Sequence, residues 1–125
     1  MAALSLLRRS AVVSTAESAM GVMVIASFRP KPGMSAALDA CARDHLPILR
    51  VEGLATDRPA LVLRATDGTL LEIFEWVSEA AIEAAHANPA VHALWDRYGA
   101  CCEYVTLGDL AEARTMFPSF ALVDP

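Results

Sequence analysis

The stretch LLEIFEWVSEAAIEAAHANPAVHALWDRY, residues 70–98, decides the fold of this chain. It predicts a buried strand that ends at Trp76, followed by a helix that Ser78 caps, because a Ser side chain can accept hydrogen bonds from the first helical N–H groups. Asn88 and Pro89 break this helix and begin another, since Pro is favoured at the first helical position. The second helix carries the clearest amphipathic stripe in the chain, at helical spacing: Val91, Leu94, Trp95, Tyr98, Cys101 and Cys102.

A strand and a helix are predicted upstream of this stretch. Residues 21–29 are largely apolar on both faces of a strand, and the following Pro-Lys-Pro-Gly turns the chain. Residues 34–49 predict a helix with one apolar side that includes His45. Pro47 falls on the solvent side, where we expect it to kink or end the last turn.

Asp67-Gly68 separates two apolar runs, residues 60–66 and 69–77. This dipeptide predicts a hairpin with a tight two-residue turn, in which both residues need a positive φ. After the amphipathic helix, residues 104–107 predict a further strand. Residues 110–116 predict a short helix, and residues 117–123 an apolar, extended tail.

The predicted order is therefore β-α-β-β-α-β with a tail, an α+β fold of the ferredoxin-like type. Its two helices would cover one face of the sheet and leave the other bare, although the strands are apolar on both faces. The chain is 55% hydrophobic, and a domain of 125 residues has little interior for so much apolar surface. We therefore expect a homodimer in which the bare faces meet.

Length, charge and cysteine content limit the domain organisation and the partners that this chain can have. One domain over residues 21–125 is expected, preceded by a disordered leader over residues 1–20. A net charge of −5 argues against nucleic acid or an anionic membrane as a partner, since both select a basic face. The three cysteines form no disulfide framework or metal-ligand spacing, so we interpret them as reduced thiols of a cytoplasmic protein without a metal.

Three segments together resemble a known family. They are the first strand with its Pro-Gly end (residues 28–33), the pattern Glu-x-Trp-x-Ser-Glu-Ala-x-x-x-x-His (residues 75–86), and Asn-Pro-x-Val-x-x-Leu (residues 88–94). The chain is similar, over about residues 21–107, to the antibiotic-biosynthesis-monooxygenase-like branch of the dimeric α/β barrels. The resemblance implies a homodimer of back-to-back sheets, with a pocket between sheet and helices in each subunit. It also implies oxidation of phenolic or polycyclic compounds without metal or flavin.

Other members of this superfamily degrade haem, with a Trp and a His on the second helix. When Trp76 is matched to the family's strand-end Trp, Ala85 stands where those members have their Trp, and Trp95 where they have their ligand His. This departure argues against haem degradation, although His86 nearby could be a displaced ligand. We therefore expect no cofactor.

Two histidines are candidate catalytic groups. His45 lies near the centre of the first helix's apolar stripe, and it is either a buried neutral side chain with one hydrogen-bond partner or a base in a pocket. His86 either caps local carbonyls at its helix end or forms part of the pocket wall. We interpret His92 as a surface residue that pairs with Asp96 four residues on.

Aromatic and charged residues complete the candidate pocket. Phe74, Trp76, Trp95 and Tyr98 are expected in the core or as walls for a flat hydrophobic ligand. Glu72 shares a strand face with Phe74, and Arg64 is on the neighbouring strand, so the two either line the pocket or form a cross-strand ion pair.

The resemblance, together with these candidate residues, implies a cofactor-independent monooxygenase or related oxidoreductase for a small aromatic or polyketide-like compound, with His45 or His86 as base. Two alternatives remain open: a dimer that binds a small molecule without catalysis, and a purely structural dimer whose pocket its own side chains fill.

Overall fold

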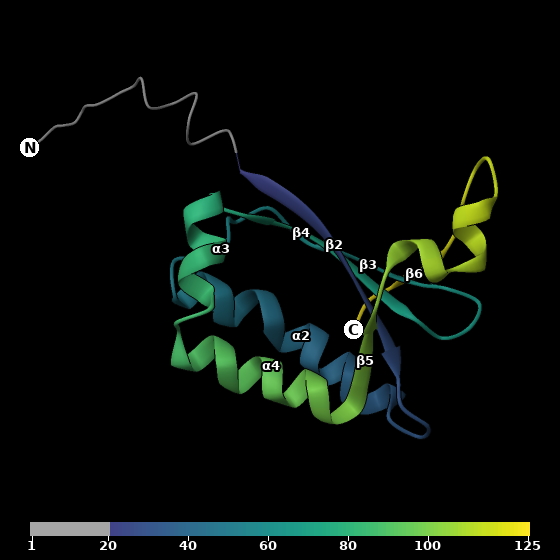
Figure 1. Ribbon diagram of the computed structural model, residues 1–125, viewed down its shortest axis with the longest axis horizontal. Coiled ribbons are helices and arrows are strands. Elements are labelled where there is room, and N and C mark those ends of the chain that lie inside the picture. Colours follow the sequence, from purple (N-terminus) through teal and green to yellow (C-terminus); the bar gives the residue numbers. More distant parts are fainter. Residues whose placement is uncertain (1–20) are drawn as a thin grey trace, which may run out of the picture.

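The computed structural model describes residues 21–125, so the expected leader over residues 1–20 lies outside the described range. The described chain is a mixed α+β structure, in which a five-stranded antiparallel sheet carries three α-helices on one face (Figure 1). The elements are β2 (Val22–Pro30), α2 (Ser35–Val51), β3 (Leu61–Arg64), β4 (Leu70–Trp76), α3 (Glu79–Ala85), α4 (Pro89–Cys101), β5 (Cys102–Val105) and β6 (Ala121–Val123).

The strands lie in the order β5-β2-β4-β3-β6, and each strand is antiparallel to its neighbours. The longest pairing joins β2 to β4, from Val22 opposite Trp76 to Phe28 opposite Leu70. β5 pairs with β2 only from Ser27 to Pro30, so the first half of β2 has no strand neighbour on that side within the described chain. The predicted extended tail forms the fifth strand, β6, which pairs with the outer edge of β3.

Strand alternation divides the side chains between two faces. On the inner face, beneath the helices, Phe28, Leu70 and Val62 join Leu38 of α2 and Leu94 of α4 in one buried cluster. A second cluster lies toward α3 and contains Phe74, Trp76, Leu49, Ala85 and Val91. The predicted apolar stripes of α2 and α4 therefore do face the sheet.

The opposite sheet face, here called the outer face, is only partly covered. Leu110, in the segment after β5, packs there on Leu71 and Ala65. Beyond this cover the face remains apolar and open: Met23, Ile25, Leu61 and Leu122 are each at least half exposed, and Ile73 lies between Ile25 and Leu61 in the sheet. The prediction of a bare apolar sheet face is confirmed for this part of the sheet.

The two helix starts on the far side of β4 form as predicted. Ser78 Oγ accepts a hydrogen bond from the N–H of Ala81 at 3.0 Å. Asn88 Oδ1 accepts from the N–H groups of Ala90 and Val91, at 2.9 and 3.1 Å, and Pro89 is the first residue of α4. Each cap satisfies N–H groups that have no partner within the helix, which is why α3 and α4 begin where they do.

The α2 and hairpin predictions were wrong in detail. Helix α2 continues through the exposed Pro47 to Val51 instead of ending near it. The hairpin turn is also longer than two residues: Gly68 N–H donates to Ala65 O, and Ala65 N–H to Thr69 O. Gly68 carries the positive φ of this turn, +93°, in keeping with the conformational freedom of glycine.

Two later boundaries also differ from the prediction. Cys102 is extended and begins β5, which therefore spans residues 102–105 instead of 104–107. The predicted short helix over residues 110–116 is instead two 3₁₀ turns, Leu107–Asp109 and Ala111–Arg114. The Asp109 carboxylate accepts a hydrogen bond from the N–H of Thr106, which helps to form the first turn where no regular helix begins.

Candidate functional site

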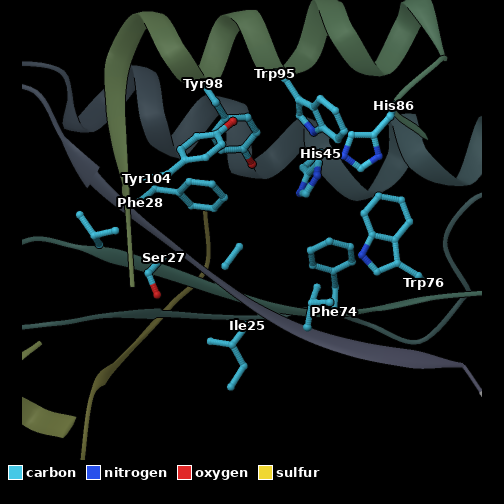
Figure 2. A pocket seen from close by; sticks show the side chains of 13 residues that line it. Ile25, Ser27, Phe28, His45, Phe74, Trp76, His86, Trp95, Tyr98 and Tyr104 are labelled. Carbon is cyan, nitrogen blue, oxygen red and sulfur yellow. The ribbon is translucent and has the colours of Figure 1, made fainter. Parts of the chain in front are cut away.

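A pocket of about 410 Å³ lies between the inner face of the sheet and the helices (Figure 2). Residues on both sides of the point where the pairing of β2 with β5 begins contribute to it. Most of its surface is apolar, as is usual for small-molecule sites. It is lined by Val24, Ile25, Ala26, Ser27, Phe28, His45, Phe74, Trp76, His86, Trp95, Tyr98, Tyr104 and Val105.

Aromatic rings form the walls of this pocket. Phe28 stacks on Tyr98 with ring centroids 4.5 Å apart, and Tyr104 packs on Phe28 edge-on. Phe74 and Trp76 lie at the other end, 5.5 Å apart, opposite Trp95 and His86 (Figure 2). Flat faces on several sides suit a flat, apolar ligand better than a flexible or strongly hydrated one.

The polar centre of the site is a hydrogen-bonded group of His45, Glu72 and Tyr98. His45 Nδ1 lies 2.7 Å from Glu72 Oε2, and the Tyr98 hydroxyl donates to Glu72 Oε1 at 3.0 Å. All three side chains are buried, and Glu72 has no exposed surface. Burial and the neighbouring Glu72 carboxylate raise the pKa of Tyr98 well above its ordinary value of 10.0, so Tyr98 stays a neutral donor.

The hydrogen bonds of Glu72 determine the tautomer of His45. An ionised carboxylate only accepts hydrogen bonds, so the proton of a neutral His45 must lie on Nδ1. Nε2 then carries the lone pair. Nε2 has no hydrogen-bond partner among the described residues. It is also not one of the side-chain atoms in this part of the chain that are both fully buried and without a partner. A neutral His45 therefore presents a proton acceptor to the pocket that it lines.

Local structure explains how three distant positions meet. Glu72 is on the inner face of β4, opposite Ala26 of β2 and Val62 of β3, and these small neighbours leave its carboxylate room to rise between the helices. His45 comes from the buried side of α2 and Tyr98 from the buried side of α4. The antiparallel sheet fixes the position of Glu72, while packing of the two helices brings the other two side chains onto it.

His86 lies at the rim of the pocket. Its Nδ1 is 2.9 Å from the carbonyl oxygen of Ile82, four residues earlier, so this nitrogen is used on the helix as predicted for a capping role. Its ring packs edge-on against Trp95, with centroids 5.3 Å apart, and it also lines the pocket. His86 therefore both bonds to a carbonyl at its helix end and forms part of the pocket wall. Unlike the buried His45, it is exposed.

The structure places most of the predicted pocket residues together and separates one. Phe74, Trp76, Trp95 and Tyr98 all line the pocket, and Glu72 backs it. Arg64 does not line it, nor does it pair with Glu72. It is opposite Leu70 in the sheet, and its guanidinium binds both carboxylate oxygens of Asp39 on α2 at 3.1 Å. The predicted ion pair between Glu72 and Arg64 was therefore wrong, because each of these two residues bonds to side chains on a helix instead.

The prediction for His92 was right about exposure and wrong about its partner. Its Nε2 contacts the carbonyl oxygen of His86, not the carboxylate of Asp96. Its ring also stacks on Trp95, with centroids 5.9 Å apart. His92 does not line the pocket.

Sequence reasoning missed the side of the pocket made by β2 and β5. Phe28 and Tyr104 are directly opposite each other in the sheet and form one wall. Phe28 was visible as an aromatic residue on an apolar strand, but its contact with Tyr104 depends on the strand order. The Tyr98–Glu72 hydrogen bond was missed for the same reason.

Three cysteines lie close to the site but do not line it. The sulfurs of Cys41 and Cys101 are 3.9 Å apart, and Cys102 Sγ is 3.0 Å from the carbonyl oxygen of Tyr98. All three are free and buried, and burial raises the pKa of Cys102 to about 12. Within residues 21–125, no group of three or more His, Cys, Asp and Glu residues is placed to hold a metal ion.

No protein-family model, curated protein or solved structure matches this chain.

Proposed function

We propose that this protein is a cofactor-independent monooxygenase that oxidises a small aromatic or polyketide-like phenol in the pocket beside His45. The observation that carries the proposal is an open, aromatic pocket of about 410 Å³ whose enclosed His45 is held by a buried carboxylate. This pocket argues against a purely structural role, because side chains do not fill it. Two histidines reach it, and the better base is the one that a second group orients.

His45 would act as the general base. With its proton on Nδ1 held by Glu72, Nε2 takes the proton of the substrate hydroxyl. The imidazolium that forms is paired at once with the Glu72 carboxylate, while Tyr98 donates to the other carboxylate oxygen. The charge created by proton transfer therefore meets a preformed and buried partner.

The oxidation itself uses the electrons of the substrate. The phenolate transfers one electron to dioxygen, and the resulting pair combines at a ring carbon to give a hydroperoxide. Loss of water from this intermediate leaves a quinone, so the overall change is phenol plus O₂ to quinone plus H₂O. The residues of this chain bind the ring and remove and hold one proton.

Oxygen consumption tests this proposal. We expect uptake of O₂ with a panel of naphthols and hydroquinones, and a loss of about 10²–10⁴-fold in His45→Ala, the usual contribution of a positioned base. His86→Ala should lose less, because its ring lies at the rim. His92→Ala is the matched control, since it makes the same chemical change outside the pocket lining and should stay within about threefold of the wild type.

Each result of this assay has a defined meaning. Uptake that survives His45→Ala would contradict the role of His45 as base. Binding of the same compounds without uptake would favour the alternative of a non-catalytic small-molecule-binding dimer, for which the same pocket would serve. Neither binding nor uptake would leave the structural dimer.

We also propose that two copies assemble through the outer face as a dimeric α/β barrel. The element order β-α-β-β-α-β and the strand order β5-β2-β4-β3 support a ferredoxin-like unit of the kind that forms such dimers. A continuous row of Ile25, Ile73 and Leu61 crosses three strands on this face, next to the exposed Met23. A lone chain would leave this apolar surface in water, and a second copy is the simplest cover.

A charged substitution on each of two outer-face strands tests the assembly. The wild type should scatter light as a dimer at micromolar concentration, and Met23→Glu/Leu61→Glu as a monomer. Val51→Glu is the control, because Val51 is equally apolar and more exposed but lies at the end of α2 on the opposite side of the sheet. A wild type of monomer mass would contradict the proposal.

Location in the cytoplasm is part of the same proposal. Its support is the set of three free, buried thiols, which is typical of a reducing compartment. Among residues 21–125, no helix combines the length and the apolar character needed to cross a bilayer.

A further inference from the structure

We infer that the pocket selects its ligand by proton content: it takes a neutral hydroxy-aromatic molecule and rejects a carboxylate of the same shape. This inference rests on the proposed function only in treating the pocket as the ligand site. It concerns binding and not turnover, so it can be tested with oxygen excluded.

A fixed negative charge backs the site, and no fixed positive charge balances it. Glu72 has a side chain only 1% exposed, and its two partners are His45 and Tyr98, neither of which is a permanent cation. None of the residues that line the pocket in the described chain is Lys or Arg. A carboxylate ligand therefore finds no counter-ion waiting for it, unlike the usual anion sites built from Arg or Lys.

The charged and titratable groups around His45 are otherwise few. From β4 it faces Glu72, and from α4 it faces Tyr98, 5.4 Å away between ring centroids. His86 and Tyr104, both exposed, lie at the rim. On its own helix Cys41 is buried with a raised pKa.

The nearby cations are committed elsewhere. On the surface of α2 and α4, Arg97 binds Asp44 at 3.0 Å. Arg64, on β3, binds Asp39 of α2. Neither guanidinium lines the pocket. Of the two histidines that line the pocket, His45 is the one that contacts Glu72.

Proton counting then separates two ligand classes. A phenol brings its own proton, and transfer to Nε2 leaves the total charge of ligand, His45 and Glu72 unchanged at −1. An ionised carboxylate raises the total to −2 in a low-dielectric site, unless the protein takes up a proton from water to charge His45.

Anaerobic titration with 2-naphthol and 2-naphthoate is the direct test, because the two probes share one ring system and differ in the acidic group. Quenching of Trp76 and Trp95 fluorescence reports occupancy, since both indoles line the pocket. At pH 8 we expect the naphthoate Kd to exceed that of the naphthol by at least about 100-fold, because the buried carboxylate of Glu72 opposes a second negative charge.

Removal of the buried charge should remove the discrimination. Glu72→Gln keeps the shape and an acceptor for His45 but carries no charge, so the ratio of the two Kd values at pH 8 should fall by at least about tenfold. Glu83→Gln is the matched control, because it removes the same charge from the exposed surface of α3 and should leave the ratio unchanged. Tyr98→Phe is a second variant that keeps the carboxylate, so the ratio should persist.

Defined outcomes overturn the inference. Equal affinities of wild type for the two probes at pH 8 would do so, as would an unchanged ratio in folded Glu72→Gln, or no binding of either probe. If Glu72→Gln does not fold, the wild-type ratio at pH 8 decides. Selective binding without oxygen uptake would contradict only the proposed oxidation. Oxygen uptake with unselective binding would contradict only this inference.

Discussion

At the scale of single residues, the fully buried Glu72 joins the chemistry of the site to the stability of the fold. It accepts from His45 at 2.7 Å and from Tyr98 at 3.0 Å, so each of its two carboxylate oxygens has a partner. A carboxylate is costly to bury, and these two donors are what make its position tolerable.

Glu72→Ala should therefore destabilise the protein by about 3–5 kcal/mol, because it leaves two buried donors unpaired and a cavity between α2 and α4. Urea denaturation followed by circular dichroism would measure the loss. Glu83→Ala, on the exposed surface of α3, should stay within about 0.5 kcal/mol of wild type. A loss below about 1 kcal/mol for Glu72→Ala would show that water or another group replaces the carboxylate readily.

Glu75, on the outer face, should contribute to the fall of the unfolding free energy at acid pH, here called the acid limb. Hydrogen bonds from Arg58 Nε and Thr56 Oγ1, both at 2.9 Å, lower the pKa of Glu75 below its ordinary value of 4.5. A depressed folded-state pKa adds stability that is present above pH 4.5 and is lost as the pH falls through the lower, folded-state value. Glu75→Gln should flatten the decline of the unfolding free energy below pH 4.5, measured by urea titrations from pH 3 to 6. An unchanged acid limb would show that the interaction is fully screened by solvent.

At the scale of elements, the start of α4 controls where Trp95 and Tyr98 enter the pocket. Asn88 accepts from two N–H groups of the first turn, and its side-chain amide also donates to Glu52 at the end of α2. This one residue therefore caps α4 and ties it to the neighbouring helix.

Asn88→Ala should cost about 1 kcal/mol, within the usual range of 0.5–2 for a lost cap. Thermal unfolding would measure it, with Asn88→Asp as the comparison. Asp keeps the cap but cannot donate to Glu52, so it separates the cap from the contact between helices. A loss in Asp as large as in Ala would assign the effect to the contact with Glu52.

At the scale of the whole molecule, the open outer face predicts how stability depends on concentration. If two copies cover Met23, Ile25 and Leu61, folding is coupled to association. The thermal midpoint of the wild type should then rise with protein concentration, whereas that of Met23→Glu/Leu61→Glu should not. A wild-type midpoint that is constant over a hundredfold range of concentration would argue against coupled assembly.

Much of this molecule follows from local sequence patterns. The caps at Ser78 and Asn88, the apolar sides of α2 and α4, and the position of the hairpin all depend on residues within a few positions of one another. Hydrogen bonding at helix ends and the repeat of side-chain direction are short-range effects, so one sequence is enough to predict them. The same patterns placed four aromatic pocket residues on inner faces, where the structure has them.

Tertiary structure alone decided which partners those residues have. Glu72 and Arg64 lie on adjacent strands, yet each pairs with a helix, because α2 packs across both strands and offers His45 to one and Asp39 to the other. The sequence pattern predicts that residues 117–123 are extended. Whether part of this segment forms a strand depends on a sheet edge with which it can pair, and β3 provides that edge for β6. The pocket itself depends on side chains from β2, β4, β5, α2 and α4 that only the packed fold brings together. Such features depend on how distant elements pack, and side-chain periodicity along the chain carries no information about that.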